Sequence, residues 1–186
     1  FEPEEGTEVI EAESMEQGLR GLLKGALGDM GEAGGMPEET DLTGEQPLEF
    51  TAQNLQGEKV AVSTFRGKPL VLDFWATWCP PCLEELPTLN ELYQEYRNQG
   101  LQVVAVSTDA SVQEVTSYLE DHDIGFTVLW LSPEADANVS EDYGITSIPR
   151  TLYIGTDWTV EVDDTGLHPK GEMLDALEQI GIQVSR

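Results

Sequence analysis

The sequence has few basic side chains for its length. Nine Lys and Arg stand against 36 Asp and Glu among 186 residues, which gives a formal net charge of −27 at pH 7. A field of this sign repels nucleic acid and anionic lipid, so we exclude both as partners. The acids are spread along the chain: residues 1–45 hold thirteen acids and two bases, and residues 46–186 hold twenty-three and seven. Two interpretations stay open, a solvated surface that keeps the protein soluble and, given only four lysines, adaptation to high salt.

Long apolar runs, further cysteines and clustered histidines are also absent. No stretch of eighteen apolar residues occurs, which predicts that no helix crosses a membrane. Because the chain begins at Phe1 rather than Met, we expect a mature or trimmed form from which a signal or anchor could have been removed. Two cysteines cannot build a disulfide framework, and a structural zinc site needs about four ligands. His122 and His168 are each isolated in sequence, so we expect no metal and no cofactor.

The only two cysteines, Cys79 and Cys82, lie between a predicted strand and a predicted helix. The run Leu70–Trp75 is nearly all apolar and short enough for a buried strand. Cys79 is expected at the N-cap of the following helix, where unpaired backbone N–H groups and the helix dipole favour its thiolate. Pro80 and Pro81 suit the first two helical positions, which have no intrahelical partner for an N–H. Cys82 then lies one turn into the helix, with its N–H facing the Cys79 sulfur.

This dithiol predicts thiol–disulfide exchange. Cys79, nearer to solvent, would attack a substrate disulfide, and the more buried Cys82 would resolve the mixed disulfide. Asp73 lies in the apolar strand, where a charged carboxylate is costly to bury. Its pKa should therefore rise, which suits it to accept a proton from Cys82. The alternatives are an inert pair of cysteines and an Asp73 that reaches water.

The segment Trp78–Cys82, with the sequence WCPPC, resembles the active site of the thioredoxin superfamily. Together with Glu85 and Pro87 it resembles the TlpA/ResA-like branch, which includes the cytochrome c maturation thioredoxins. The resemblance covers about Leu48 to Ile180. It implies an α/β fold in which a thioredoxin-like mixed β-sheet is flanked by helices, with an N-terminal β-hairpin and a central strand–helix insertion.

The hydrophobic periodicity and the end signals place the elements of this fold along the chain. The expected strands are a hairpin over 48–62, single strands over 70–75, 101–107 and 126–130, and a second hairpin of strands 151–154 and 158–162. The expected helices cover 79–98, a segment that begins at Ser111, 133–143 and 169–180. Residues 47–186 are thus predicted to form the thioredoxin-like domain. Residues 1–46 are predicted to be an acidic extension with an amphipathic helix over about 14–30 and a linker. That helix could dock on its own domain or mediate self-association.

The resemblance also implies roles for residues beyond the cysteines. Glu85 is expected to tune the cysteines and to assist proton transfer. Pro149 matches the cis-proline that lies beside the dithiol, so that Ile148 would offer its backbone to an extended substrate. Trp78 is expected to lie flat beside the dithiol, where partner proteins approach.

Two residues depart from the pattern of the relatives. Asp73 corresponds to the buried acid of thioredoxin, whereas the TlpA/ResA-like branch more often has Asn. Arg150 follows Pro149 at a position where small or hydroxyl residues are commoner. We interpret Arg150 as a group that attracts acidic substrates.

These features predict an extracytoplasmic thiol–disulfide oxidoreductase that mainly reduces disulfides in partner proteins and receives electrons from an upstream thiol donor. A salt-adapted cytoplasmic protein is the alternative location. A thiol peroxidase is an alternative function, which needs Thr and Arg near the reactive cysteine; Thr77 is close, but no Arg is near in sequence. A non-enzymatic interaction module, in which residues 15–30 recruit a partner, is a third hypothesis.

Overall fold

The centre of the fold is the strand β3 (Leu70–Trp75), in which all six residues are buried. The structure is a computed structural model, and it describes residues 40–185. Strand β3 pairs in parallel with β4 (Gln102–Ser107) and antiparallel with β6 (Arg150–Ile154). A strand covered on both faces is usually apolar along its whole length. This explains why every residue of β3 except Asp73 is hydrophobic.

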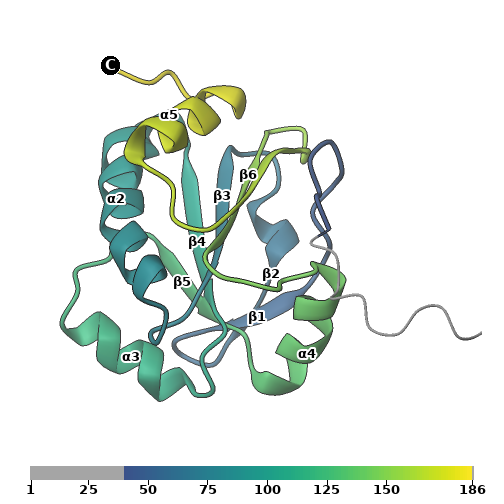
Figure 1. The fold of residues 1–186 in the computed structure, drawn as a ribbon, viewed down its shortest axis with the longest axis vertical. Helices are drawn as coiled ribbons and strands as arrows, with labels where there is room; N and C mark the ends of the chain where they lie inside the picture. Colours follow the sequence, from purple (N-terminus) through teal and green to yellow (C-terminus); the bar gives the residue numbers. More distant parts are fainter. Residues whose placement is uncertain (1–39, 186) are drawn as a thin grey trace, which may run out of the picture. The chain divides into compact units, whose positions relative to one another are not determined.

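Within residues 40–185 these strands extend to a seven-stranded mixed sheet in the order β2-β1-β5-β4-β3-β6-β7. The outer strands are β1 (Thr51–Asn54), β2 (Lys59–Ala61), β5 (Thr127–Trp130) and β7 (Val160–Thr165). The sheet and its helices confirm the expected thioredoxin-like α/β fold, with β1 and β2 as the N-terminal hairpin (Figure 1).

Helices cover both faces of the sheet and build a hydrophobic core on each. One core contains buried side chains of α2 (Pro80–Tyr96), α3 (Val112–Glu120) and α5 (Lys170–Gln179). The other contains side chains of α4 (Pro133–Asp142) and of a short 3₁₀ helix, Val62–Phe65. Figure 1 shows α2, α3 and α5 on one side of the strands and α4 on the other. No helix within the described residues is long and apolar enough to cross a membrane.

The structure confirms most predicted elements and corrects one strand. We expected the last strand over 158–162, but β7 runs over Val160–Thr165. Trp158 lies in the preceding turn with φ 72° in the left-handed region, and its backbone N–H donates to the Gly155 carbonyl. Its bulk suits a strand, but here the residue closes the hairpin and buries its ring, which is 3% exposed.

Residues 40–46, which we predicted as the end of the linker, pack against β7. Leu42 is buried and its N–H donates to the Asp163 carboxylate at 2.9 Å. Backbone hydrogen bonds join Gly44 to Val160, and Val160 to Glu45. Residues 40–185 belong to one compact unit. The predicted helix over 14–30 lies outside the described residues, and the boundary at 46/47 stays a prediction.

Candidate active site

The two cysteines form a disulfide at the N-terminus of α2, with their Cα atoms 5.3 Å apart. Cys79 is the N-cap, and its sulfur accepts the backbone N–H of Cys82 at 3.3 Å. Pro80 and Pro81 occupy the first two helical positions, as expected. A reduced Cys79 would thus face an N–H donor and the positive end of the helix dipole, which both favour its thiolate.

A buried carboxylate fixes the turn between β3 and α2. Asp109 accepts hydrogen bonds from the backbone N–H of Thr77 at 3.0 and 3.1 Å and from the Thr77 hydroxyl at 2.6 Å. The Ser107 hydroxyl donates to the same carboxylate at 2.7 Å. We did not predict Asp109, although it follows a strand that runs parallel to β3 and ends at the same edge of the sheet.

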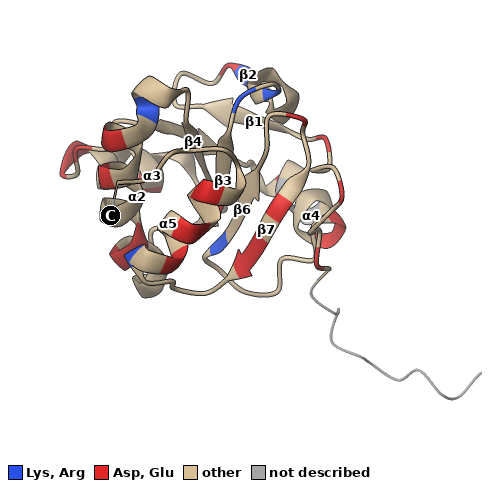
Figure 2. Cartoon of the chain, turned by 90° about the horizontal axis from the view of Figure 1, so that it is seen from above, with Lys and Arg blue, Asp and Glu red and all other residues tan. Residues whose placement is uncertain are grey.

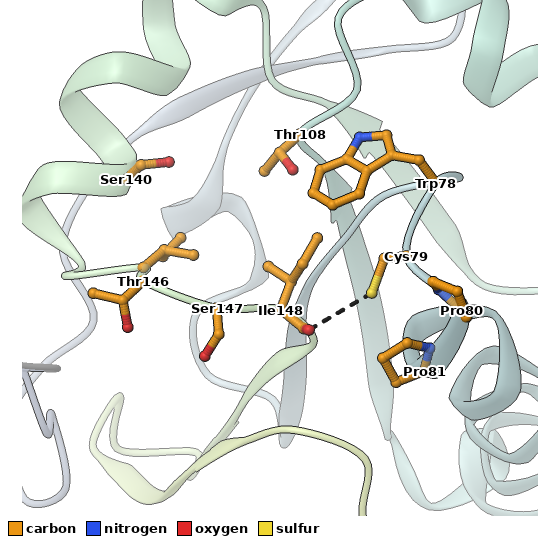
Figure 3. Close-up of a pocket in the computed structure, with 10 residues that line it drawn as sticks. Trp78, Cys79, Pro80, Pro81, Thr108, Ser140, Thr146, Ser147 and Ile148 are labelled. Atoms are coloured by element: carbon orange, nitrogen blue, oxygen red, sulfur yellow. Dashed lines mark hydrogen bonds between the residues drawn. The ribbon is translucent and has the colours of Figure 1, made fainter.

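The disulfide borders a surface groove with a volume of about 520 Å³. Residues 78–81 line one side, residues 145–148 line the other, and Thr108 and Ser140 complete it (Figure 3). None of these side chains is charged. Figure 2 shows Asp and Glu in red on α4, α5 and β7, with few Lys and Arg in blue, so the groove is a neutral area on an acidic protein.

The groove is lined by Trp78 and Ile148, two of the three residues that we expected to bind substrate, and Pro149 directly follows Ile148 in the chain. The Ile148–Pro149 peptide bond is cis, and the Ile148 carbonyl oxygen lies 3.6 Å from the Cys79 sulfur. In the disulfide this sulfur has no proton to donate, whereas a reduced Cys79 thiol could donate there. The Trp78 side chain is 66% exposed beside the disulfide. Trp75, by contrast, is fully buried in the core.

Two acids, Asp73 on β3 and Glu85 on α2, are buried, each about 1% exposed. The Thr151 hydroxyl is 3.2 Å from Asp73 Oδ1 and 3.2 Å from Glu85 Oε1. Burial raises the pKa of Asp73 to about 7, against a lowering by the Thr151 hydrogen bond. Burial, and then the charge of Asp73, raise the pKa of Glu85 to about 8. Both acids therefore titrate in the neutral range, which suits proton exchange with a cysteine.

Arg150 does not attract substrates, and our interpretation of it was wrong. Its side chain is buried at 2% exposure and pairs with Asp163, with Nη2 to Oδ2 at 2.6 Å and Nε to Oδ1 at 3.0 Å. It also donates to the carbonyl oxygens of Tyr143 and Thr40. Its donors are thus used to join β6 to β7, to the end of α4 and to the chain entering the domain.

In the described part of the chain, each of the two histidines lies beside another side chain. No group of three or more His, Cys, Asp or Glu side chains is placed there to hold a metal ion. His168 instead lies 2.9 Å from Glu172, and His122 stacks on Tyr118 with ring centroids 3.9 Å apart.

Comparison with known proteins gives consistent matches. The model of the AhpC/TSA family matches residues 43–162. The thiol-disulfide oxidoreductase ResA of Bacillus cereus is 29% identical over 160 residues, which cover 86% of this chain and 91% of that protein. A Chlorobium tepidum structure assigned as thiol:disulfide interchange protein DsbE superposes with TM-score 0.68 and 29% identity, covering 75% of this chain and 98% of that one. A secreted Mycobacterium tuberculosis disulfide oxidoreductase, homologous to E. coli DsbE, gives TM-score 0.59 and 28% identity, covering 69% and 94%.

Proposed function

Because the chain belongs to the AhpC/TSA family and is a thiol–disulfide oxidoreductase, we propose that it mainly reduces disulfides in partner proteins. Cys79 is the nucleophile and Cys82 the resolving cysteine. The observation that carries this proposal is the position of the disulfide at the N-terminus of α2. Cys79 lines one side of the groove, and Ile148, which precedes Pro149, lines the other side. The groove has room for an extended segment, and the backbone of Ile148 is placed to bind it.

The reaction starts from the reduced protein, with Cys79 as the thiolate and Cys82 as the thiol. The Cys79 sulfur attacks one sulfur of the substrate disulfide, forms a mixed disulfide and releases the other substrate sulfur as a thiolate. Cys82 loses its proton and attacks the Cys79 sulfur, which restores the Cys79–Cys82 disulfide and releases the second substrate thiolate. Two electrons pass to the substrate, and an upstream thiol donor returns the protein to the dithiol.

Asp73 and Glu85 serve the proton transfers of this cycle. The Cys82 thiol must be deprotonated before it attacks, and a base with a pKa near the working pH is the most effective acceptor. Burial gives both acids such a pKa, and Glu85 lies on α2 one turn beyond Cys82. Trp78, with its exposed ring, supplies the apolar contact surface for the partner protein.

The proposed location is extracytoplasmic, and the substrates are proteins. The similarity to a secreted disulfide oxidoreductase supports this location, because disulfides persist in oxidising compartments. A salt-adapted cytoplasmic protein remains the alternative, and fractionation of the producing cells separates the two. Self-association through residues 15–30 also stays a proposal; an unchanged elution volume after deletion of residues 1–38 would argue against it.

The structure favours disulfide exchange over a thiol peroxidase. A peroxidase needs Thr and Arg to polarise the peroxide at its cysteine. Here the Thr77 hydroxyl is held by Asp109 at 2.6 Å, and the buried Arg150 is paired with Asp163. Consumption of hydrogen peroxide with a thiol donor, at a rate comparable to disulfide reduction, would reverse this assignment.

Reduction of insulin by dithiothreitol tests the proposed function. Cys79→Ser should abolish the catalysed rate, and Cys82→Ser should accumulate a mixed disulfide with the substrate, visible as a slower band on a non-reducing gel. Full activity of Cys79→Ser would eliminate the proposal. The reduction potential tests the direction, since a value near −270 mV indicates a reductant and one near −120 mV an oxidant.

A further inference from the structure

Thr151 holds the two buried acids together. In the sheet, Asp73 lies between Ala105 of β4 and Thr151 of β6, so only the β6 side offers it a polar neighbour from an adjacent strand. Glu85 reaches the same hydroxyl from α2, and Thr151 Oγ1 is 3.2 Å from a carboxyl oxygen of each acid. Thr151 is itself 1% exposed. One hydroxyl therefore bridges a strand and a helix out of contact with water.

The number of protons in this cluster is limited by the hydroxyl group. A threonine hydroxyl has one proton to donate and lone pairs with which to accept. It can donate to one ionised carboxylate, but its contact with the second acid is a hydrogen bond only if that acid is protonated and donates. Two ionised carboxylates around one buried hydroxyl would leave one charge without a donor. The geometry thus fits one ionised and one protonated acid.

We propose that Thr151 is a positioning residue that couples Asp73 and Glu85 into a pair sharing one proton, and that this pair accepts the proton of Cys82. This inference rests on the proposed function and adds the residue that couples the two acids. Cys82 and Glu85 are three residues apart on α2, a spacing that places them on the same side of a helix. Glu85 therefore lies on the same side of α2 as Cys82, whose thiol must be deprotonated.

The proton balance of the resolving step follows from this pair. In the mixed disulfide, the Cys82 thiol gives its proton to the singly protonated pair, which becomes neutral with two protons. The Cys82 thiolate attacks the Cys79 sulfur, forms the Cys79–Cys82 bond and breaks the bond to the substrate, whose sulfur leaves as a thiolate. The pair then releases one proton to solvent or to that thiolate and returns to its singly protonated form.

Several other titratable groups act on this pair. Asp164 of β7 raises the pKa of Glu85 through its charge, and His168, which follows β7, lowers it. Tyr153 of β6 is buried, and the negative charges of Glu85, Asp164 and Asp73 add to the rise of its pKa. These groups stay unchanged when only the Thr151 hydroxyl is removed, so a matched substitution at Thr151 isolates its effect.

The experiment compares Thr151→Val, which keeps the side-chain shape without the hydroxyl, with Thr151→Ser, which keeps the hydroxyl. Reduced protein is mixed with 5,5′-dithiobis(2-nitrobenzoate) in a stopped-flow instrument from pH 5 to 9. The first released thionitrobenzoate reports attack by Cys79, and the second reports resolution by Cys82. This probe needs no natural substrate, so it is independent of the activity towards proteins.

In Thr151→Val we expect the pH midpoint of the second phase to rise by at least about one unit, because neither acid has the donor that stabilises its ionised form. Below the midpoint the resolution rate then falls about tenfold, while Thr151→Ser stays within about twofold of the wild type. An unchanged midpoint in Thr151→Val, or an equal shift in both variants, would overturn the inference. In an Asp73→Asn background the effect of Thr151→Val should shrink; a fully retained effect would also overturn it.

Failure of this inference and failure of the proposed function give different results. If the function is wrong, Cys79→Ser retains insulin reduction whatever the Thr151 variants do. If only the pairing is wrong, Cys79→Ser is inactive and the Thr151 variants keep the wild-type pH profile.

Discussion

Asp73→Asn should make the protein more stable, and more so as the pH rises. The side chain is about 1% exposed, and burial raises its pKa from an ordinary value of 3.8 to about 7. Each unit of difference between the folded and unfolded pKa corresponds to about 1.4 kcal/mol. Ionised Asp73 therefore destabilises the folded state by about 4 kcal/mol relative to the protonated acid.

The sign follows from proton binding. The folded protein binds the Asp73 proton more tightly than the unfolded chain does. The contribution of this proton to the free energy of unfolding is therefore complete below about pH 4 and is lost as the pH rises through about 7. About 2 kcal/mol of that loss falls between pH 5.5 and pH 8. Asparagine has no proton to lose, so the stability difference between Asp73→Asn and the wild type should grow by about 2 kcal/mol over this interval.

Urea denaturation of the oxidised protein, followed by tryptophan fluorescence at pH 5.5 and pH 8, measures this difference. The free energy of unfolding falls by about 2 kcal/mol per molar urea. The difference between the urea midpoints of Asp73→Asn and the wild type should therefore be about 1 M larger at pH 8 than at pH 5.5. Glu84→Gln is the matched control, since it removes an equal charge from an exposed position on α2 and should show no such widening. A constant difference between Asp73→Asn and the wild type across this interval would refute the argument.

Three further substitutions test other parts of the structure. Arg150→Met leaves Asp163 buried without its cation and should lower the unfolding free energy by about 3–5 kcal/mol; a loss below about 1 kcal/mol in urea would contradict the buried ion pair. Trp78→Ala removes a 66% exposed side chain, so stability should change by less than about 0.5 kcal/mol while KM for a protein disulfide rises about tenfold; an unchanged KM would remove Trp78 from the binding surface. Leu42→Ala should cost about 2–5 kcal/mol in the same urea assay, and no loss would show that residues 40–46 do not belong to the cooperative unit.

The local chemistry of the dithiol could be predicted because it depends on neighbouring residues. An N-cap followed by two prolines and a cysteine has few conformations available, and the structure has Cys79 as the N-cap of α2 with the Cys82 N–H on its sulfur. The burial of Asp73 followed from the apolar run around it. These predictions needed no knowledge of which strands are adjacent.

The partners of Arg150 and Thr151 could not be predicted because they depend on the register of the sheet. Our last strand stopped at residue 162, one residue short of Asp163, so the carboxylate that pairs with Arg150 lay outside the predicted sheet. Thr151 has no special position in the sequence until Asp73 is seen opposite it. Side-chain contacts between residues about 80 positions apart, such as Thr151 and Asp73, arise only once the chain is folded.

The neutral groove on an acidic molecule separates the selection of substrates into two stages. The chain carries a net charge of −27, which acts on a partner over a distance of about 8 Å at physiological ionic strength and therefore sets the rate of encounter. The groove itself offers a bound segment no charged side chain, so the turnover of a partner already seated there is insensitive to its charge. Cationic and anionic substrates should thus differ in kcat/KM but not in kcat, and added salt should bring the two values of kcat/KM together.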